Sequence, residues 1–167
     1  PTLTAALPVI DQCWALTSYQ GPIKSAVLAY KSGTRNQLPA LIAGLDLVRT
    51  ATGIKEGTLA GIPSPQAKVA ERGFETIGTL VRGLAKISGW PVEKPLRFTK
   101  SVSEQVGLSR SYREQNLTQA FIANRVISGT VVLVDDIVTT GATASAAASA
   151  LRIAGAQTIF QICLCRV

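Results

Sequence analysis

An apolar run without alternation, residues 131–134, leads directly into two neighbouring carboxylates, Asp135 and Asp136. β-Branched residues without a two-residue period predict a strand that is buried on both faces, as in a parallel sheet. Ligands gather at the carboxyl ends of such strands, and the acidic pair lies at that end. The sequence therefore predicts an α/β protein whose functional site surrounds Asp135 and Asp136.

The residues that follow the acidic pair are suited to a phosphate. Thr139, Thr140 and Thr143 supply hydroxyl donors, and Gly141 lets the backbone approach a ligand closely. The Ala-rich stretch 144–154 predicts a helix whose free N–H groups carry about half a positive charge. A phosphate monoester fits such a helix start.

The acidic pair has two interpretations. Two carboxylates side by side suit the hydroxyls of a sugar, or a hydrated Mg²⁺ that bridges those hydroxyls to a phosphate. Alternatively, an Asp after a buried strand caps the next helix, and Thr-Thr-Gly is ordinary turn chemistry. Capping needs one carboxylate at most, whereas two adjacent anions call for a cation or several donors. We therefore favour the ligand site.

The remaining segments predict strands that alternate with helices. Residues 1–20 are expected to form an arm or strand that leads into a single domain over residues 21–167. The expected helices cover residues 24–30, 38–48, 74–84 and 144–154, and the expected strands cover 58–62, 92–98, 121–123, 131–135 and 158–164. Pro95 suggests that 92–98 lies at a sheet edge. This order predicts a doubly wound, mostly parallel sheet.

Composition excludes several other classes of protein. The chain is 47% hydrophobic but only 5% aromatic, has no P-loop or dinucleotide glycine motif, and contains no apolar stretch of membrane-spanning length. Its three cysteines, without any His, cannot form a zinc site and are expected to be reduced, which favours the cytoplasm.

The net charge of +7 is dispersed, because no two Lys or Arg residues are adjacent. A weak contact with single-stranded DNA is therefore the least favoured function.

Residues 131–143 resemble the phosphoribosyl pyrophosphate (PRPP) motif of type I phosphoribosyltransferases. The segments 71–74 and 105–110, together with Arg113 and Asn116, resemble the ComF branch of that family, whose amidophosphoribosyltransferase-like members are linked to bacterial DNA uptake. The resemblance runs from about Tyr19 to the C-terminus and implies the type I phosphoribosyltransferase fold.

The resemblance also implies roles for individual residues. Asp135 and Asp136 would hold the ribose hydroxyls, partly through Mg²⁺, and the 5′-phosphate would be wrapped by Val138, Thr139, Thr140, Gly141, Ala142 and Thr143. The pyrophosphate would lie over the turn at Ser64 and Pro65. Lys31 matches a Lys in the early region of the family. The loop 99–116 would close over PRPP, bringing Lys100, Arg110 and Arg113 to the pyrophosphate, so that Arg110 and Arg113 join the two acids as expected catalytic residues.

Ser64 and Arg72 carry alternatives. Ser64 stands where ComF relatives commonly have His, and the turn around it is either a pyrophosphate site or only a rigid turn. Arg72 is expected at the start of a helix, where a cation is misplaced against the helix dipole unless it meets a ligand anion or pairs with Glu71 or Glu75. Glu75 is expected to disfavour the binding of a polyanion, because its carboxylate is also negatively charged.

Two function hypotheses follow. The first is a Mg²⁺-dependent phosphoribosyltransferase that transfers to an unidentified acceptor. Thr139 stands where purine-salvage relatives often have an Asp, so this acceptor is expected not to be a salvaged purine. The second is a PRPP-binding module with weak or lost catalysis that acts in DNA uptake through protein or DNA partners. The sequence leaves the oligomeric state open, a homodimer included.

Overall fold

The computed structural model describes residues 2–4, 9–99 and 120–167, and its centre is a six-stranded sheet in the order β1-β2-β8-β7-β3-β4. β1 (Thr2–Thr4) is antiparallel to β2, and the other neighbours are parallel. These strands are β2 (Gln12–Ser18), β3 (Thr58–Gly61), β4 (Val92–Glu93), β7 (Thr130–Val138) and β8 (Thr158–Arg166). The predicted α/β class with a mostly parallel sheet is confirmed. Strand β2, from the segment expected to lead into the domain, pairs with β8 inside the sheet.

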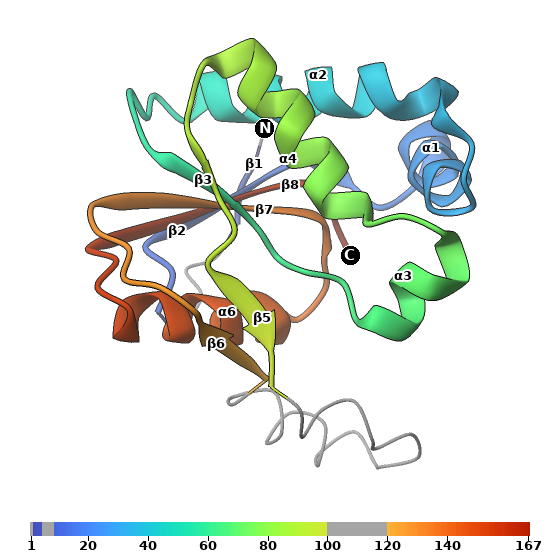
Figure 1. Cartoon of the computed structure of the whole chain (residues 1–167). Coiled ribbons are helices and arrows are strands. Elements are labelled where there is room, and N and C mark those ends of the chain that lie inside the picture. The colour runs from blue at the N-terminus through green and yellow to red at the C-terminus, as the bar shows by residue number, and fades with distance from the viewer. Residues whose placement is uncertain (1, 5–8, 100–119) are drawn as a thin grey trace.

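Helices cover both faces of this sheet (Figure 1). One face carries α1 (Gly21–Lys31), the 3-10 turn η1 (Arg35–Gln37), α2 (Leu38–Ala51) and α4 (Thr76–Ser88), and the other carries α6 (Ala142–Ile153). The short helix α3 (Gln66–Arg72) lies at the edge beside the C-terminus of β3. Among the described helices, none has both the length and the apolar composition that a membrane span needs.

The pleat of β7 divides the core into two layers. Val132 and Val134 pack in the cluster that includes side chains of α2 and α4, whereas Val131 and Leu133 pack in the cluster that includes side chains of α6. Small residues of α6, mostly alanines, let this helix lie close to the sheet. A strand buried on both faces needs apolar side chains at every position, which is why 131–134 shows no alternation.

Two expected strands belong to a separate sheet. β5 (Leu96–Phe98) pairs antiparallel with β6 (Phe121–Ala123), and this pair packs against α6. The predicted edge position is confirmed for residues 92–93, whereas the prediction of one strand over 92–98, and of 121–123 in the main sheet, is wrong. Pro95, which has no N–H to donate, separates β4 at the edge of the main sheet from β5 in the second sheet.

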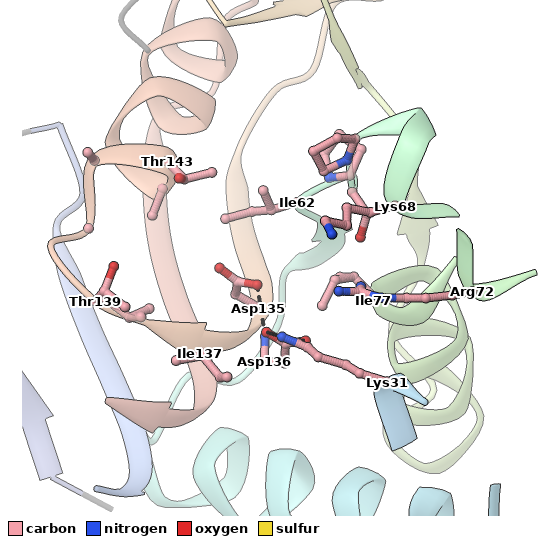
Figure 2. A pocket seen from close by; sticks show the side chains of 17 residues that line it. Lys31, Ile62, Lys68, Arg72, Ile77, Asp135, Asp136, Ile137, Thr139 and Thr143 are labelled. Atoms are coloured by element: carbon pink, nitrogen blue, oxygen red, sulfur yellow. Dashed lines mark hydrogen bonds and ion pairs between the residues drawn. The ribbon is translucent and has the colours of Figure 1, made fainter. Parts of the chain in front are cut away.

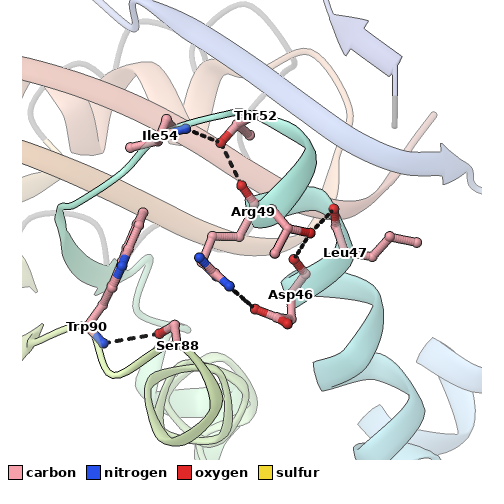
Figure 3. Close-up of polar contacts among 8 residues, drawn as sticks. Asp46, Leu47, Arg49, Thr52, Ile54, Ser88 and Trp90 are labelled. Carbon is pink, nitrogen blue, oxygen red and sulfur yellow. Dashed lines mark hydrogen bonds and ion pairs between the residues drawn. The ribbon is translucent and has the colours of Figure 1, made fainter.

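Polar contacts end α2 and hold it against the chain after α4 (Figure 3). The Thr52 hydroxyl donates to the Arg49 carbonyl (2.7 Å) and accepts the Ile54 N–H (3.2 Å). The Arg49 guanidinium pairs with Asp46 (2.7 Å) and lies 5.2 Å from the centre of the Trp90 ring. These contacts turn the chain from α2 towards β3, whose C-terminal end borders the cleft described below.

Gly83 of α4 allows close contact with Ile42 of α2. A Cβ at Gly83 would overlap Cδ1 of Ile42 and lie 2.8 Å from its Cγ1. We expect Gly83→Ala to lower the free energy of unfolding by up to about 2 kcal/mol, because overpacking costs about 1–3 kcal/mol and the better helix propensity of Ala offsets up to about 1 kcal/mol. Chemical denaturation measures this change. In an Ile42→Val background, which lacks Cδ1, the same substitution should cost less; equal costs in both backgrounds would contradict the packing argument.

Candidate functional site

A cleft of about 220 Å³ lies at the carboxyl ends of β3 and β7. The predicted site residues that line it are Lys31, Ser64, Pro65, Arg72, Asp135, Asp136, Val138, Thr139, Gly141, Ala142 and Thr143. Ile62, Lys68 and Ile77 also line it, and sequence reasoning did not assign them. Thr140 lies outside the lining, and Lys100, Arg110 and Arg113 lie outside the described residues.

The two carboxylates point in different directions (Figure 2). They occupy successive positions of β7, and successive side chains of a strand point to opposite faces of a sheet. Asp135 points between Thr143 and Ile62, whereas Asp136 points towards Lys31. The expected pair of side-by-side acceptors is therefore divided between two parts of the cleft.

Asp136 is a buried anion held by Lys31. The Nζ atom of Lys31 lies 2.9 Å from Oδ1 and 2.8 Å from Oδ2 of Asp136, and Asp136 is only 6% exposed. Lys31 is the last residue of α1, so a contact over 105 positions of sequence ties this helix to β7. Buried charges are tolerated when they are paired in this way.

Asp135 has no comparable counter-charge. Its Oδ1 accepts the N–H of Asp136 (2.9 Å), and none of the ion pairs between described residues involves it. Burial, followed by the charge of Asp136, raises the pKa of Asp135 to about 8. A carboxyl group in this position is stabilised by donors or by a cation brought by a ligand.

The turn after β7 presents backbone donors to the cleft. Gly141 has φ +79° and is the N-cap residue of α6, so this position has no side chain that could accept the next N–H groups. The Thr140 hydroxyl accepts the N–H of Ala142 (3.3 Å), which explains why Thr140 supports the turn and does not line the cleft. The N–H groups of Thr143 and Ala144 in the first turn of α6 therefore form a site suited to an anion, next to the hydroxyls of Thr139 and Thr143.

The wall opposite Asp135 carries cations. Lys68 and Arg72 of α3 line this wall together with the turn of residues 63–65 (Figure 2). Lys68 pairs with the exposed Glu71 (2.8 Å). With Lys31 at its base, the wall suits a ligand with several negative charges.

The helix around Arg72 differs from the prediction. The chain forms two helices: α3 ends at Arg72, Gly73 takes the left-handed conformation (φ +77°), and α4 begins at Thr76. Arg72 is thus at a helix C-terminus, where a cation is favourable, and the argument from a misplaced charge is wrong. Neither acid named as its alternative partner forms an ion pair with Arg72: Glu71 pairs with Lys68, and Glu75 caps α4.

Glu75 is a helix cap, which sequence reasoning missed. Its carboxylate accepts the N–H groups of Ile77 (3.2 Å) and Gly78, and it also accepts the hydroxyl of Ser64 (3.2 Å). The helix dipole stabilises this negative charge, so Glu75 is compensated within the fold. The Ser64 hydroxyl is directed at Glu75, and its donor is used there.

Phe74 connects the elements around the cleft. Its ring contacts Tyr30 of α1 edge-on (5.4 Å) and lies under the guanidinium of Arg35 (5.0 Å). The Tyr30 hydroxyl donates to the Thr76 carbonyl (2.8 Å). The position of Lys31 is fixed by these contacts of the preceding residue, which a sequence pattern does not reveal.

The described residues contain no cluster of three or more His, Cys, Asp or Glu side chains that could hold a metal ion. Mg²⁺, which the sequence resemblance implies, binds to proteins through one or two carboxylates together with phosphate oxygens. Asp135, a carboxyl group with a single N–H partner, fits such a site if the ligand supplies the other oxygens.

Comparisons with known proteins agree with the geometry. Residues 68–167 match the model of the phosphoribosyl transferase domain. The chain is 30% identical over 161 residues to DNA utilization protein YhgH of Salmonella typhimurium, covering 91% of this chain and 70% of that protein. The protein of the same name from Escherichia coli K12 is 29% identical over 160 residues, with coverage of 90% and 70%.

Solved structures show the same fold. The glutamine PRPP amidotransferase of B. subtilis, complexed with ADP and GMP, superposes with a TM-score of 0.53 at 24% identity, over 77% of this chain and 27% of that chain. An allosteric regulatory enzyme of purine biosynthesis gives 0.52 at 25% identity, over 76% and 26%. This chain thus spans about a quarter of each of these structures. From its residues, its sheet and its relatives, the chain belongs to the phosphoribosyltransferase family, in the ComF branch of the type I fold.

Proposed function

We propose that this protein binds PRPP in the cleft between β7 and α3 and transfers its phosphoribosyl group to an acceptor. The observation that carries the proposal is the division of chemistry between the two walls. One wall has a carboxyl group that no described residue pairs with, next to a helix start whose N-cap is a glycine, and the other has cations. PRPP has hydroxyls between two phosphate-bearing ends, which is the pattern these walls complement.

The N-terminal turn of α6, with Thr139 and Thr143, is proposed to bind the 5′-phosphate, and Asp135 is proposed to accept hydrogen bonds from the ribose hydroxyls. The pyrophosphate group would lie towards Lys68 and Arg72. Arg110 and Arg113, by resemblance, would join it from residues 99–116. This assignment matches each group of PRPP to the charge of the wall that it faces. It places the sugar along the carboxyl end of the sheet.

In the transfer, a lone pair of the acceptor forms a bond to C1 of the ribose while the bond from C1 to the pyrophosphate oxygen breaks. Pyrophosphate leaves with the electron pair, and the acceptor loses a proton. Cations placed where the leaving group gains charge lower the barrier of this step. Bound Mg²⁺ would neutralise part of the charge on the phosphate oxygens next to Asp135.

Ser64 favours a second candidate, a PRPP-binding module with weak transfer. Its hydroxyl donates to Glu75, so the turn supports a leaving group less than a free donor would. The relatives are named DNA utilization proteins, which supports a role in DNA uptake through protein or DNA partners. Both candidates place PRPP in the same cleft and differ in whether pyrophosphate is released.

PRPP binding can be tested by thermal unfolding with and without Mg²⁺. At a hundred times the dissociation constant, a ligand stabilises the folded state by about 2.7 kcal/mol, or roughly 5–10 °C for a domain of this size. We expect this shift for the wild type and its loss for Asp135→Asn. Glu56→Gln, which removes an exposed carboxylate elsewhere, should keep it. If PRPP does not raise the unfolding temperature of the wild type, either with or without Mg²⁺, the proposal is rejected.

Asp135→Asn should also stabilise the ligand-free, Mg²⁺-free protein. Because the folded-state pKa of Asp135 is raised to about 8, above an unfolded value of about 3.9, wild-type stability falls as pH rises between these values. We expect a gain of at least about 1 kcal/mol at pH 7, since one pKa unit corresponds to about 1.4 kcal/mol and solvent screens part of the effect. Urea denaturation at several pH values measures it. Asp46→Asn, which breaks an ion pair with Arg49, should give no such gain.

A screen of amine and nucleobase acceptors, with pyrophosphate release from Mg²⁺-PRPP as the readout, separates the two candidates. The transferase predicts release that requires an acceptor and falls in Asp135→Asn. Binding without release for every acceptor class would favour the binding module. Purine bases are expected to be inactive, because Thr139 offers no general base near neutral pH.

A further inference from the structure

We propose that Lys31 is a permanent counter-cation of Asp136, so that Asp136 does not bind magnesium. Asp136 then positions Asp135, and Asp135 is the acid that contacts the ligand and its magnesium. The inference rests on the proposed function, because it concerns how the same cleft holds PRPP. It assigns different tasks to two acids that the family motif treats alike.

The ammonium group of Lys31 engages the whole carboxylate of Asp136. The Nζ atom lies within 2.9 Å of both oxygens, and the aspartate is almost fully buried. A magnesium ion demands oxygen ligands at about 2.1 Å in octahedral geometry. It would have to displace a cation that already fills this position, and the positive charge of Lys31 opposes its approach.

Lys31 is held where it is by its neighbours. Tyr30 is 1% exposed, and its hydroxyl donates to the Thr76 carbonyl of α4 (2.8 Å). Lys31 also ends α1, where a cation interacts favourably with the helix dipole. Releasing Lys31 to bind a phosphate would leave a buried carboxylate without a partner, which is unfavourable.

The pair acts on Asp135 through the backbone. Asp136 donates its N–H to Oδ1 of Asp135 at 2.9 Å. Fixing the Asp136 side chain therefore fixes the peptide that orients the Asp135 carboxyl group. Lys31 is thus a positioning residue, and it acts through Asp136 on the carboxyl group that lacks a counter-charge.

The rival arrangement has Lys31 leave Asp136 and contact the pyrophosphate, with both acids binding Mg²⁺. The two arrangements predict opposite effects of removing the Lys31 charge on metal binding. If Lys31 takes the place of a cation, its removal leaves the buried Asp136 carboxylate without its counter-charge and opens the place of the ammonium group to a divalent ion. If Lys31 serves only the phosphates, its removal leaves metal binding to the ligand-free protein unchanged.

The test is a titration of ligand-free protein with Mn²⁺, followed by electron paramagnetic resonance, and with Mg²⁺ by calorimetry. We expect Lys31→Met to bind either ion at least tenfold more tightly than the wild type, and Lys31→Met/Asp136→Asn to lose this gain. Lys68→Met removes a cation from the same cleft without freeing Asp136, so it should show no gain. Equal metal affinity of Lys31→Met and Lys68→Met would overturn the proposal.

PRPP binding gives a second readout. The double variant, in which a neutral pair replaces the ion pair, should bind PRPP more tightly than Lys31→Met alone; the reverse order would overturn the positioning role. If Lys31→Met does not fold, the single acid variants decide: Mg²⁺ should still tighten PRPP binding to Asp136→Asn but not to Asp135→Asn, and the opposite result would reject the division of roles. A wild type that binds no PRPP would reject the proposed function, while the metal titration would still test Lys31.

Discussion

The cleft exists because β7 is longer than its partner β3. The two strands pair only from Thr58 to Gly61 of β3, whereas β8 pairs with β7 as far as Val138. The last bond on the β3 side runs from the N–H of Ile62 to the Val134 carbonyl (3.2 Å). The prolines at 63 and 65 cannot donate to a ladder, so the chain leaves the sheet and α3 forms the other wall. Residues 135–138 are thereby opened on one side while β8 supports them on the other.

This geometry decides how charge is distributed. Two anions near the cleft are compensated by the protein: Asp136 by Lys31, and Glu75 by the start of α4 and the Ser64 hydroxyl. Among the residues that the structure describes, Asp135 has no ion-pair partner, and it faces a wall that carries Arg72. A ligand that completes the site must donate hydrogen bonds at one point and present negative charge on either side of it. A phosphorylated sugar has this arrangement, whereas an extended single strand of nucleic acid would need a continuous cationic track.

Sequence reasoning identified the parts of the site that are local in the chain. Residues 131–143 predict a buried strand, a phosphate-binding turn and a helix. The signals for these three elements, an unbroken apolar run, a glycine and a helix start, follow one another directly in the sequence. It failed where structure depends on contacts between distant segments. The pair of Lys31 with Asp136 spans 105 positions, and the second sheet pairs β5 with β6, which lies more than 20 positions later in the chain. Gly73 is a predictable helix end, but the apolar spacing from Phe74 onward predicts a helix start at Phe74 and so does not reveal the cap at Glu75.

The two walls also separate binding from transfer. The sugar and its 5′-phosphate are proposed to depend on Asp135 and the start of α6, whereas the leaving group depends on the wall that includes Ser64. Because no described residue forms an ion pair with Asp135, a ligand that supplies donors or a cation there would offset a cost already present in the ligand-free fold. That contribution does not depend on whether Ser64 assists the pyrophosphate. Loss of transfer is therefore compatible with retained binding, so a transferase and a binding module of this family can have the same cleft.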